Sequence, residues 1–223
     1  MIRVNGVRET EDSGRRGARR RRRWWALSAC LAALPLGAGT ARAFIVNVAP
    51  AVVEIDAPAS VLPGMLQGPD IHAFDERQDV QLAAALLVDH QGPGLVNDPG
   101  DLNPAWIPAG TCIRSHYIHY DPVNANSANG AVQFAGEIVG VIVRPATLDA
   151  SNGLGAAFTA YPPNAGAGAC LVGGNTCGLE LTVPPQDSFQ IDQDVLRVNF
   201  QALNPGDRIR VITKSCGCDP KPN

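Results

Sequence analysis

The sequence predicts an all-β fold, a single antiparallel β-sandwich of jelly-roll-like form with long loops. Three observations support this prediction. The 223-residue chain contains 23 glycines and 18 prolines, and only 17% of its residues are charged. Its apolar runs are short and are separated by turn-forming residues. Several of these runs alternate apolar and polar residues with the period of two that is typical of strands.

Residues 1–43 differ in composition from the rest of the chain. They hold 10 of the 18 basic residues, nine of them before the apolar run WWALSACLAALPLGAG and one within the triplet Ala41–Ala43 that follows it. A basic region, a short apolar region and an A-x-A site are the pattern of a secretory signal peptide. We therefore predict cleavage after Ala43 and a secreted or periplasmic domain at 44–223. The apolar run is shorter than the roughly 20 residues of a transmembrane helix, so no stable membrane anchor is expected.

Two other export routes remain open. The arginine pairs before Trp24 are also compatible with a twin-arginine signal, although ordinary signal peptides are basic as well. The segment Leu27–Cys30 resembles a lipoprotein signal box. The residues after Cys30, however, continue apolar through Leu36 instead of opening a polar linker. We therefore favour a mature N-terminus at Phe44.

Removal of the first 43 residues would make the remaining chain acidic. Residues 1–43 contain 10 basic and 3 acidic residues. Residues 44–223 therefore contain 8 basic and 18 acidic residues and have a net charge near −10. Such a charge argues against nucleic acid or an anionic membrane as the partner. It is compatible with divalent cations or basic partners, and also with acidity that serves solubility alone.

The roughly 180 remaining residues are enough for one domain with a sizeable core. Eight segments are expected to form its strands, because each is short, rich in β-branched or aromatic residues, and bounded by turn signals. They are Phe44–Ile55, Val80–Asp89, Thr111–Tyr120, Val132–Val143, Gly178–Val183, Ser188–Ile191, Val195–Phe200 and Asp207–Thr213.

The region Ser115–Val143 is expected to hold two core strands joined by a polar loop. Tyr117, Ile118 and Tyr120 favour a strand in the first half, and Asp121 with Pro122 ends it. In the second half, both parities of Ile138–Val143 are apolar or glycine, which is typical of a strand that is buried on both faces. We therefore predict that Ile138–Val143 is a central strand.

Two later segments show clear alternation. Asp192, Gln193 and Asp194 are expected to form a hairpin turn before a strand whose Arg197 and Asn199 face water. In the last strand Ile209, Val211 and Thr213 alternate with Arg208 and Arg210.

One segment is ambiguous and two are expected to be irregular. The sequence VQLAAALLV within Gln78–His90 contains strong helix formers and fits a helical spacing as well as strand parity. We favour a strand, because no helix cap precedes the segment in good register. Residues 91–110 and 148–178 are expected to be mostly loop.

The cysteines suggest a disulfide framework, because export would place them in an oxidising compartment. A local bridge from Cys170 to Cys177 is expected across the glycine-containing loop between them. A long-range bridge from Cys112 to Cys216 or Cys218 would tie the C-terminal region to the sheet. Removal of residues 1–43 would leave five of the six cysteines, an odd number, so we expect an unpaired thiol within the Cys216–Cys218 triplet.

No catalytic signature is present, and no catalytic residue is predicted. The motifs HExxH and GxSxG and a glycine-rich phosphate loop are all missing from the sequence. His116 and His119 are three apart, so strand geometry puts them on opposite faces, where they cannot share a metal ion. A general base at His119 oriented by Asp121, or a glycosidase-like pair of Asp121 and Glu137, are the enzymatic alternatives.

A calcium site is the better metal candidate. Asp98, Asp101 and Asn103 place three side-chain oxygens in a tight loop before Trp106, and calcium prefers such oxygen ligands. The spacing does not match an EF-hand loop, and Asx residues are ordinary turn formers, so a plain loop is the favoured interpretation. No other cofactor is expected.

Several segments together carry a resemblance to known proteins. They are APASVLPGMLQ, HAFDE, IPAGT, SHYIHYDPV, VQFAGEIVGVI, LDASNGLG, GLEL and NPGDRIRVIT. In order and spacing they resemble a group of exported bacterial β-proteins of unknown function, many of which end in a sorting tail of the PEP-CTERM kind. This chain departs from that pattern, because its last residues, from Cys218 to Asn223, contain no apolar helix.

The resemblance implies the fold and the export route, and it implies no catalytic residue. From the sequence we therefore expect a non-catalytic extracellular binding or structural module, with a glycan or a matrix component as its partner. The alternative is an extracellular hydrolase that uses a carboxylate pair.

Overall fold

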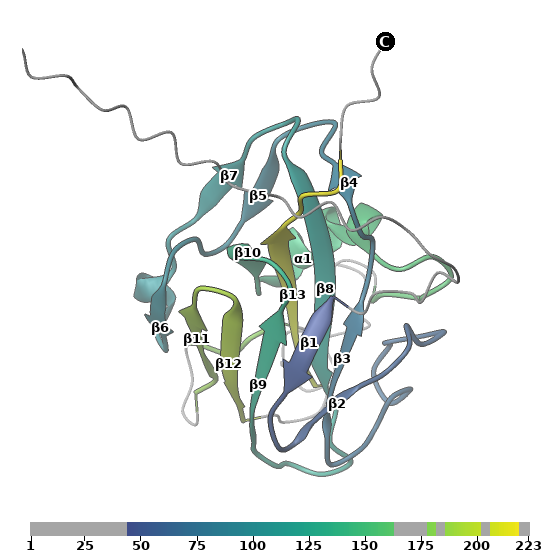
Figure 1. Cartoon of the computed structure of the whole chain (residues 1–223). Helices are drawn as coiled ribbons and strands as arrows, with labels where there is room; N and C mark the ends of the chain where they lie inside the picture. Colours follow the sequence, from purple (N-terminus) through teal and green to yellow (C-terminus); the bar gives the residue numbers. More distant parts are fainter. Residues whose placement is uncertain (1–43, 163–177, 182–185, 202–205, 219–223) are drawn as a thin grey trace, which may run out of the picture. The chain divides into compact units, whose positions relative to one another are not determined.

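Two β-sheets form the framework of the computed structural model, which describes residues 44–162, 178–181, 186–201 and 206–218. The first sheet, called sheet A, has five antiparallel strands that lie side by side in Figure 1. In spatial order they are β1 (Ile45–Val48), β9 (Ala128–Phe134), β12 (Val195–Phe200), β11 (Ser188–Asp192) and β6 (Gly94–Val96).

The second sheet, called sheet B, is built around β8, its longest strand. Its order is β10 (Ile138–Ile142), β13 (Asp207–Lys214), β8 (Cys112–Tyr120), β3 (Ile71–Asp75) and β2 (Val52–Glu54), with β4 (Val80–Gln81) also paired to β8. All these pairs are antiparallel except β2 with β3, which is parallel. Two further strands, β5 (Leu86–Val88) and β7 (Ala105–Ile107), form a separate antiparallel pair.

The main core lies between sheets A and B. Phe134, Phe189 and Phe200 point inward from sheet A. Ile118 and Tyr120 meet them from sheet B, where the Tyr120 and Phe200 rings stack with centroids 5.9 Å apart. This facing arrangement makes the protein an all-β sandwich, as the sequence predicts.

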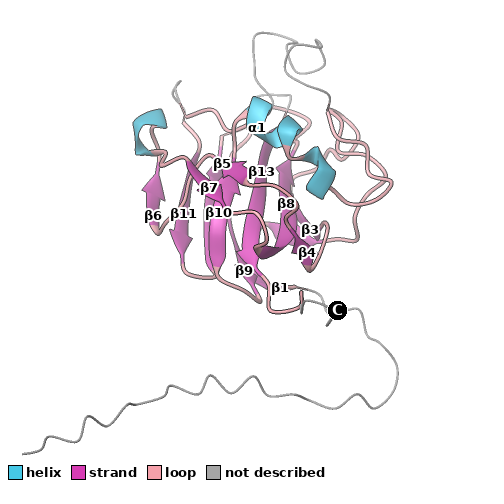
Figure 2. Cartoon of the chain, turned by 90° about the horizontal axis from the view of Figure 1, so that it is seen from above, coloured by secondary structure: helices cyan, strands magenta, loops and turns pink. Residues whose placement is uncertain are grey.

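A second apolar cluster covers the opposite face of sheet B. Phe74, Tyr117 and Ile212 lie on that face and pack with residues of β5, β7 and the helical segment α1 (Pro145–Ala150). Figure 2 shows α1 on one side of β13 and β8, with β9 and β1 on the other. Sheet B is therefore buried on both faces, whereas the outer face of sheet A carries the exposed side chains.

The buried carboxylate of Asp89, just after β5, fixes the start of α1. Its oxygens accept hydrogen bonds from the backbone N–H groups of Val143 and Arg144, each at 2.8 Å, and from the Thr147 hydroxyl. Pro145 occupies the first helical turn, where its missing N–H is not needed. Asp89 thus attaches the covering layer to the end of β10.

Several predicted strands are confirmed, most clearly the ones with strict alternation. Strands β8, β11, β12 and β13 match the predicted segments, and the β11–β12 hairpin turns at Asp192–Asp194. Arg197 is exposed, as expected. Arg208 and Arg210 alternate with the core residues of β13 as expected, but both are buried, because sheet B has no solvent-facing side there.

Two long predicted strands are each divided between the sheets. Phe44–Ile55 forms β1 in sheet A and β2 in sheet B, with a turn at Pro50 and Ala51, whose φ is 70°. Val132–Val143 likewise divides into the end of β9 and the whole of β10. Ile138–Val143 is buried but not central, since β10 is an edge strand whose Val141 pairs with His90.

The remaining predictions are met in part. Val80–Asp89 forms no helix, and only its ends, β4 and β5, are strands. The predicted loop 91–110 contains β6, β7 and the short helix η1 (Pro99–Asp101), while 148–162 holds the end of α1 and the short helix η2 (Asn152–Leu154). Gly178–Leu181 is not a strand, and residues 182–183 lie outside the described residues. Strand β3 was missed.

One disulfide is present in the described part of the chain. Cys112 at the start of β8 is bonded to Cys218, which confirms the predicted long-range bridge. Of the two predicted partners, Cys216 and Cys218, the structure therefore identifies Cys218. Cys216 is free and exposed, as expected for one member of the triplet. Cys170 and Cys177 lie outside the described residues, so their bridge stays a prediction.

Candidate functional site

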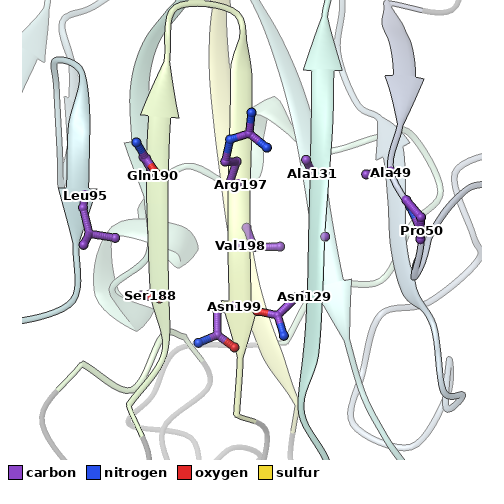
Figure 3. Close-up of a pocket in the computed structure, with 11 residues that line it drawn as sticks. Ala49, Pro50, Leu95, Asn129, Ala131, Ser188, Gln190, Arg197, Val198 and Asn199 are labelled. Atoms are coloured by element: carbon purple, nitrogen blue, oxygen red, sulfur yellow. The ribbon is translucent and has the colours of Figure 1, made fainter.

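The outer face of sheet A carries a groove that strand register builds from residues far apart in the sequence. Pairing of β11 with β12 and of β12 with β9 sets Gln190, Arg197 and Ala131 in one row. The next row on the same face contains Ser188, Asn199 and Asn129. Figure 3 shows both rows, with Leu95 at one end of the groove and Pro50 at the other.

The groove has a volume of about 420 Å³, which is within the range of small-molecule sites. Its floor is low where β9 carries Ala131, which pairs with Arg197 on the outer face. Gly130 is required for packing, because a Cβ at this position would collide with the Val52 side chain from sheet B. The short side chain of Ala131 therefore leaves space between the polar side chains of β12 and the turn at Ala49 and Pro50.

Most polar groups of the groove are available to a ligand. Gln190, Ser188 and Asn129 make no side-chain hydrogen bond within the described residues. The side-chain oxygen of Asn199 accepts a hydrogen bond from Gln201 at 2.9 Å, which leaves its amide N–H₂ group for another partner. Arg197 forms no ion pair within the same residues.

The groove therefore offers one positive charge flanked by amide and hydroxyl groups. Among its described lining residues none is acidic, aromatic or a histidine. The guanidinium group can donate hydrogen bonds to a carboxylate. The amide and hydroxyl side chains can both donate hydrogen bonds to ligand hydroxyl groups and accept hydrogen bonds from them. The lining offers no group that could act as a nucleophile activated by a base.

The structure separates the two carboxylates that were considered as a glycosidase pair. Asp121 lies against Gly206 at the start of β13, whereas the Glu137 carbonyl accepts a hydrogen bond from Lys214 at the end of β13. At about 3.4 Å per residue the strand between them spans more than about 20 Å. Glycosidase carboxyl groups are only about 5–9.5 Å apart, so Asp121 and Glu137 cannot form such a pair.

His119 and Asp121 are both fully buried. The Asp121 carboxylate accepts a hydrogen bond from the Gly64 backbone at 2.7 Å and so holds a surface loop. Burial, with further contributions from Arg208 and His72, lowers the pKa of His119 to about 3. A histidine with such a pKa is neutral at physiological pH and is held inside the fold, so it is not placed to take a proton from a substrate.

His119 is expected to make the protein sensitive to acid. Below about pH 6.5 the unfolded state gains a proton at His119, but the folded state does so only near about pH 3. In this window the wild type should lose up to about 1.4 kcal/mol of unfolding free energy per pH unit through this residue. Replacing His119 with glutamine should remove its contribution to the pH dependence of the unfolding free energy. Chemical denaturation at several pH values from 7 to 4 measures this dependence for both proteins. If the unfolding free energy falls equally with pH in the wild type and the variant, the expectation is contradicted.

The structure brings the carboxyl groups of Asp187 and Asp207 together, a pair that the sequence did not reveal. Asp187 and Asp207 are 1% and 3% exposed, and burial raises the pKa values of both carboxyl groups. The negative charges of Asp187 and Glu180 raise the pKa of Asp207 further, to well above its ordinary value. The Asp187 oxygens accept hydrogen bonds from the Glu180 and Gln201 backbones, each at 2.7 Å. The pair therefore organises chain segments inside the protein.

The loop proposed as a calcium site has the geometry of a capped turn. Asp98 accepts a hydrogen bond from Gly100 and begins the helix η1, and Asp101 accepts from the Asn97 and Asp98 backbones at 3.2 and 3.1 Å. Asn103 donates to the Gln91 carbonyl. Within the described ranges no group of three or more His, Cys, Asp or Glu residues is arranged to hold a metal ion. Calcium binding by Asp98, Asp101 and Asn103 stays a prediction.

Comparison with known proteins yields no match: no family model fits the sequence, and no curated protein or solved structure is similar to it. In the described part of the chain, no helix is long and apolar enough to cross a membrane. The groove is therefore interpreted from its own residues.

Proposed function

We propose that the protein is an exported, non-catalytic binding module whose sheet A groove binds an extracellular glycan. The observation that carries this proposal is the double row of available polar side chains on the outer face of sheet A, which no other layer of the described residues covers. Glycans present many hydroxyl groups, and the groove offers amide and hydroxyl partners for them. The sequence features of residues 1–43 and the Cys112–Cys218 disulfide support export, because disulfides persist in oxidising compartments.

Arg197 gives the groove a preference within this class of ligand. A guanidinium binds a carboxylate with two parallel hydrogen bonds, so the ligand is a glycan with a uronic acid unit. The net charge near −10 of the mature chain would repel a polyanion. A mostly neutral oligosaccharide with a single carboxylate is therefore the best fit to the groove and to its surroundings.

Binding measurements on a matched pair of ligands test this proposal. The probes are a xylo-oligosaccharide with one glucuronic acid side group and the same oligosaccharide without it. Wild-type protein should bind the acidic form about 10–100 times more tightly, as expected for a hydrogen-bonded charge of about 1.5–3 kcal/mol. Arg197→Ala should remove this preference and leave the melting temperature nearly unchanged, because Arg197 is exposed.

Lys214→Ala is the matched control. Lys214 is also exposed and cationic but lies at the end of β13, outside the groove, so its loss should leave the preference intact. Equal affinity of the wild type for the two oligosaccharides, or an equal loss of the preference for the acidic form in both variants, would refute the role of Arg197.

The hydrolase alternative would use Asp187 and Asp207, and their burial makes it the weaker proposal.

A further inference from the structure

Phe44, the first described residue, is held by three contacts that use its backbone and its side chain. Its N–H donates a hydrogen bond to the Asp75 Oδ2 atom at 2.8 Å, and its carbonyl accepts one from Ala135 at 2.8 Å. The Arg114 guanidinium lies over its ring, 3.9 Å from the centroid. These contacts hold the backbone and the ring of Phe44 in place, with its nitrogen against the Asp75 carboxylate.

Asp75 belongs to a chain of polar groups inside the sandwich. Its Oδ1 atom is 2.6 Å from His116 Nδ1, and His116 Nε2 is 3.0 Å from the Thr213 hydroxyl. His116 and Thr213 are completely buried, while the Asp75 side chain is 23% exposed. One carboxylate oxygen is thus used to orient the histidine, and the other faces the nitrogen of Phe44.

The charges around this nitrogen favour a cation. Glu54 on the neighbouring strand β2 has a raised pKa, caused by burial and by the negative charges of Asp75 and Asp56. On β8, Arg114 is paired with Asp79 at 2.8 Å, so its charge is already compensated, and His116 faces Asp75. The side chain of Lys214, at the end of β13, is exposed to solvent. The Phe44 nitrogen therefore faces a site with excess negative charge.

We propose that Asp75 binds the α-ammonium group of Phe44, which is created when the Ala43–Phe44 peptide bond is hydrolysed during export. A protease of the signal-peptidase class would add one water molecule across this bond. Ala43 would keep the new carboxylate, and the Phe44 nitrogen would become an amine that takes up a proton. The inference depends on the predicted cleavage site and is independent of the glycan groove.

The ion pair links the two sheets in the processed protein. Phe44 precedes β1, which is an edge strand of sheet A, whereas Asp75 ends β3 in sheet B. Before processing, the same position holds a neutral amide, which donates a hydrogen bond but brings no charge. Hydrogen bonds from charged donors to carboxylates are roughly twice as strong as neutral ones. Processing is therefore expected to strengthen the contact that closes this edge of the sandwich.

Two proteins that differ by one residue test the proposal. One begins at Phe44, made by removing a ubiquitin-like fusion that leaves a native N-terminus, and the other begins at Ala43; both end at Asn223. At pH 6 the protein that begins at Phe44 should melt about 2–4 °C higher, the shift expected from one added charged interaction in a domain of this size.

The pH dependence separates this ion pair from other effects. An unperturbed α-amino group has a pKa near about 8, and a neighbouring carboxylate raises it. The stabilisation is therefore complete at pH 6 and is lost as pH rises through the raised value, so the two melting temperatures should converge by about pH 10. Asp75→Asn should abolish the difference at pH 6, and the matched control Asp56→Asn, at an exposed residue, should keep it.

A second measurement remains decisive if Asp75→Asn does not fold. Titration of the α-amino group of the protein that begins at Phe44, followed by NMR after isotopic labelling of phenylalanine, should give a pKa above about 8. A pKa at or below that value, or equal melting temperatures of the two proteins at pH 6, would refute the ion pair. N-terminal sequencing of the exported protein should give Phe44, and a lipid-modified Cys30 would refute the processing step alone.

Discussion

Replacing Glu76 with alanine is expected to lower the free energy of unfolding by about 3–5 kcal/mol, the usual result of removing one partner of a buried ion pair. Glu76 binds Arg210 with both carboxylate oxygens, at 2.7 and 2.9 Å. Both side chains are completely inaccessible to solvent. Without Glu76 the guanidinium charge would remain inside the protein with no opposite charge against it.

The surroundings of this ion pair explain why its loss should be severe. Arg210 also donates to the Leu148 carbonyl and to the Ser151 hydroxyl, so it joins sheet B to the segment around α1. Burial alone would lower the pKa of Arg210, but the Glu76 carboxylate outweighs this effect and the pKa is raised. The charged pair thus holds the covering layer on the sheet.

Controls can distinguish a buried charge from the loss of packing. Glu137→Ala removes an exposed glutamate that lies beside Lys214, at the end of β13. This change should alter the free energy of unfolding by less than about 0.5 kcal/mol. The double variant Glu76→Leu with Arg210→Met should be more stable than Glu76→Ala, because it removes both charges. Chemical denaturation measures all three proteins, and a cost for Glu76→Ala similar to that for Glu137→Ala would contradict the account.

Loss of the Cys112–Cys218 disulfide is expected to have the next largest effect. The two cysteines are 106 residues apart in the sequence. On the chain-entropy model, a closed loop of about 100 residues stabilises the folded state by about 4.7 kcal/mol, chiefly by restricting the unfolded chain. Replacing both cysteines with serine should therefore lower the unfolding free energy by up to about this amount.

Cys216→Ser provides a matched control within the same triplet. Cys216 is free and exposed, so this change should leave stability and the disulfide unchanged. Non-reducing peptide mapping should find the Cys112–Cys218 linkage in both the wild type and Cys216→Ser. A Cys112–Cys216 linkage, or equal stability of the double serine variant and the wild type, would contradict the structure.

Local alternation predicted the strands whose two faces have different environments. In β12 the apolar residues Leu196, Val198 and Phe200 point inward while Arg197 is exposed, so the period of two is visible in the sequence. The same reasoning succeeded for the hairpin at Asp192–Asp194. It failed for Phe44–Ile55, because a turn at Pro50 sends continuous β-like sequence into two different sheets.

Burial on the second face of sheet B could not be predicted from the strands themselves. Arg208 and Arg210 occupy positions that would face water in a sandwich without a covering layer. They are buried because α1, η2 and the β5–β7 pair lie over that face. Glu76, the acidic partner of Arg210, was missed together with β3, a strand of five residues that ends at Asp75, directly before Glu76.

The groove was not predicted as a site because it depends on register. Gln190, Arg197 and Ala131 are unremarkable in the sequence, and only the pairing of β11, β12 and β9 places them in one row. The alternation in β12 did predict that Arg197 and Asn199 face water. The missing information was which neighbours they meet across the sheet.

The most direct test of the proposed function is NMR mapping of the isotopically labelled protein during titration with the xylo-oligosaccharide that carries glucuronic acid. Saturable shift changes are expected in the signals of Gln190, Arg197, Asn199 and Asn129, which line the groove. The neutral oligosaccharide should give much smaller changes at Arg197. Saturable changes confined to other surfaces, or no change at ligand concentrations up to millimolar, would contradict the proposal that sheet A binds a glycan.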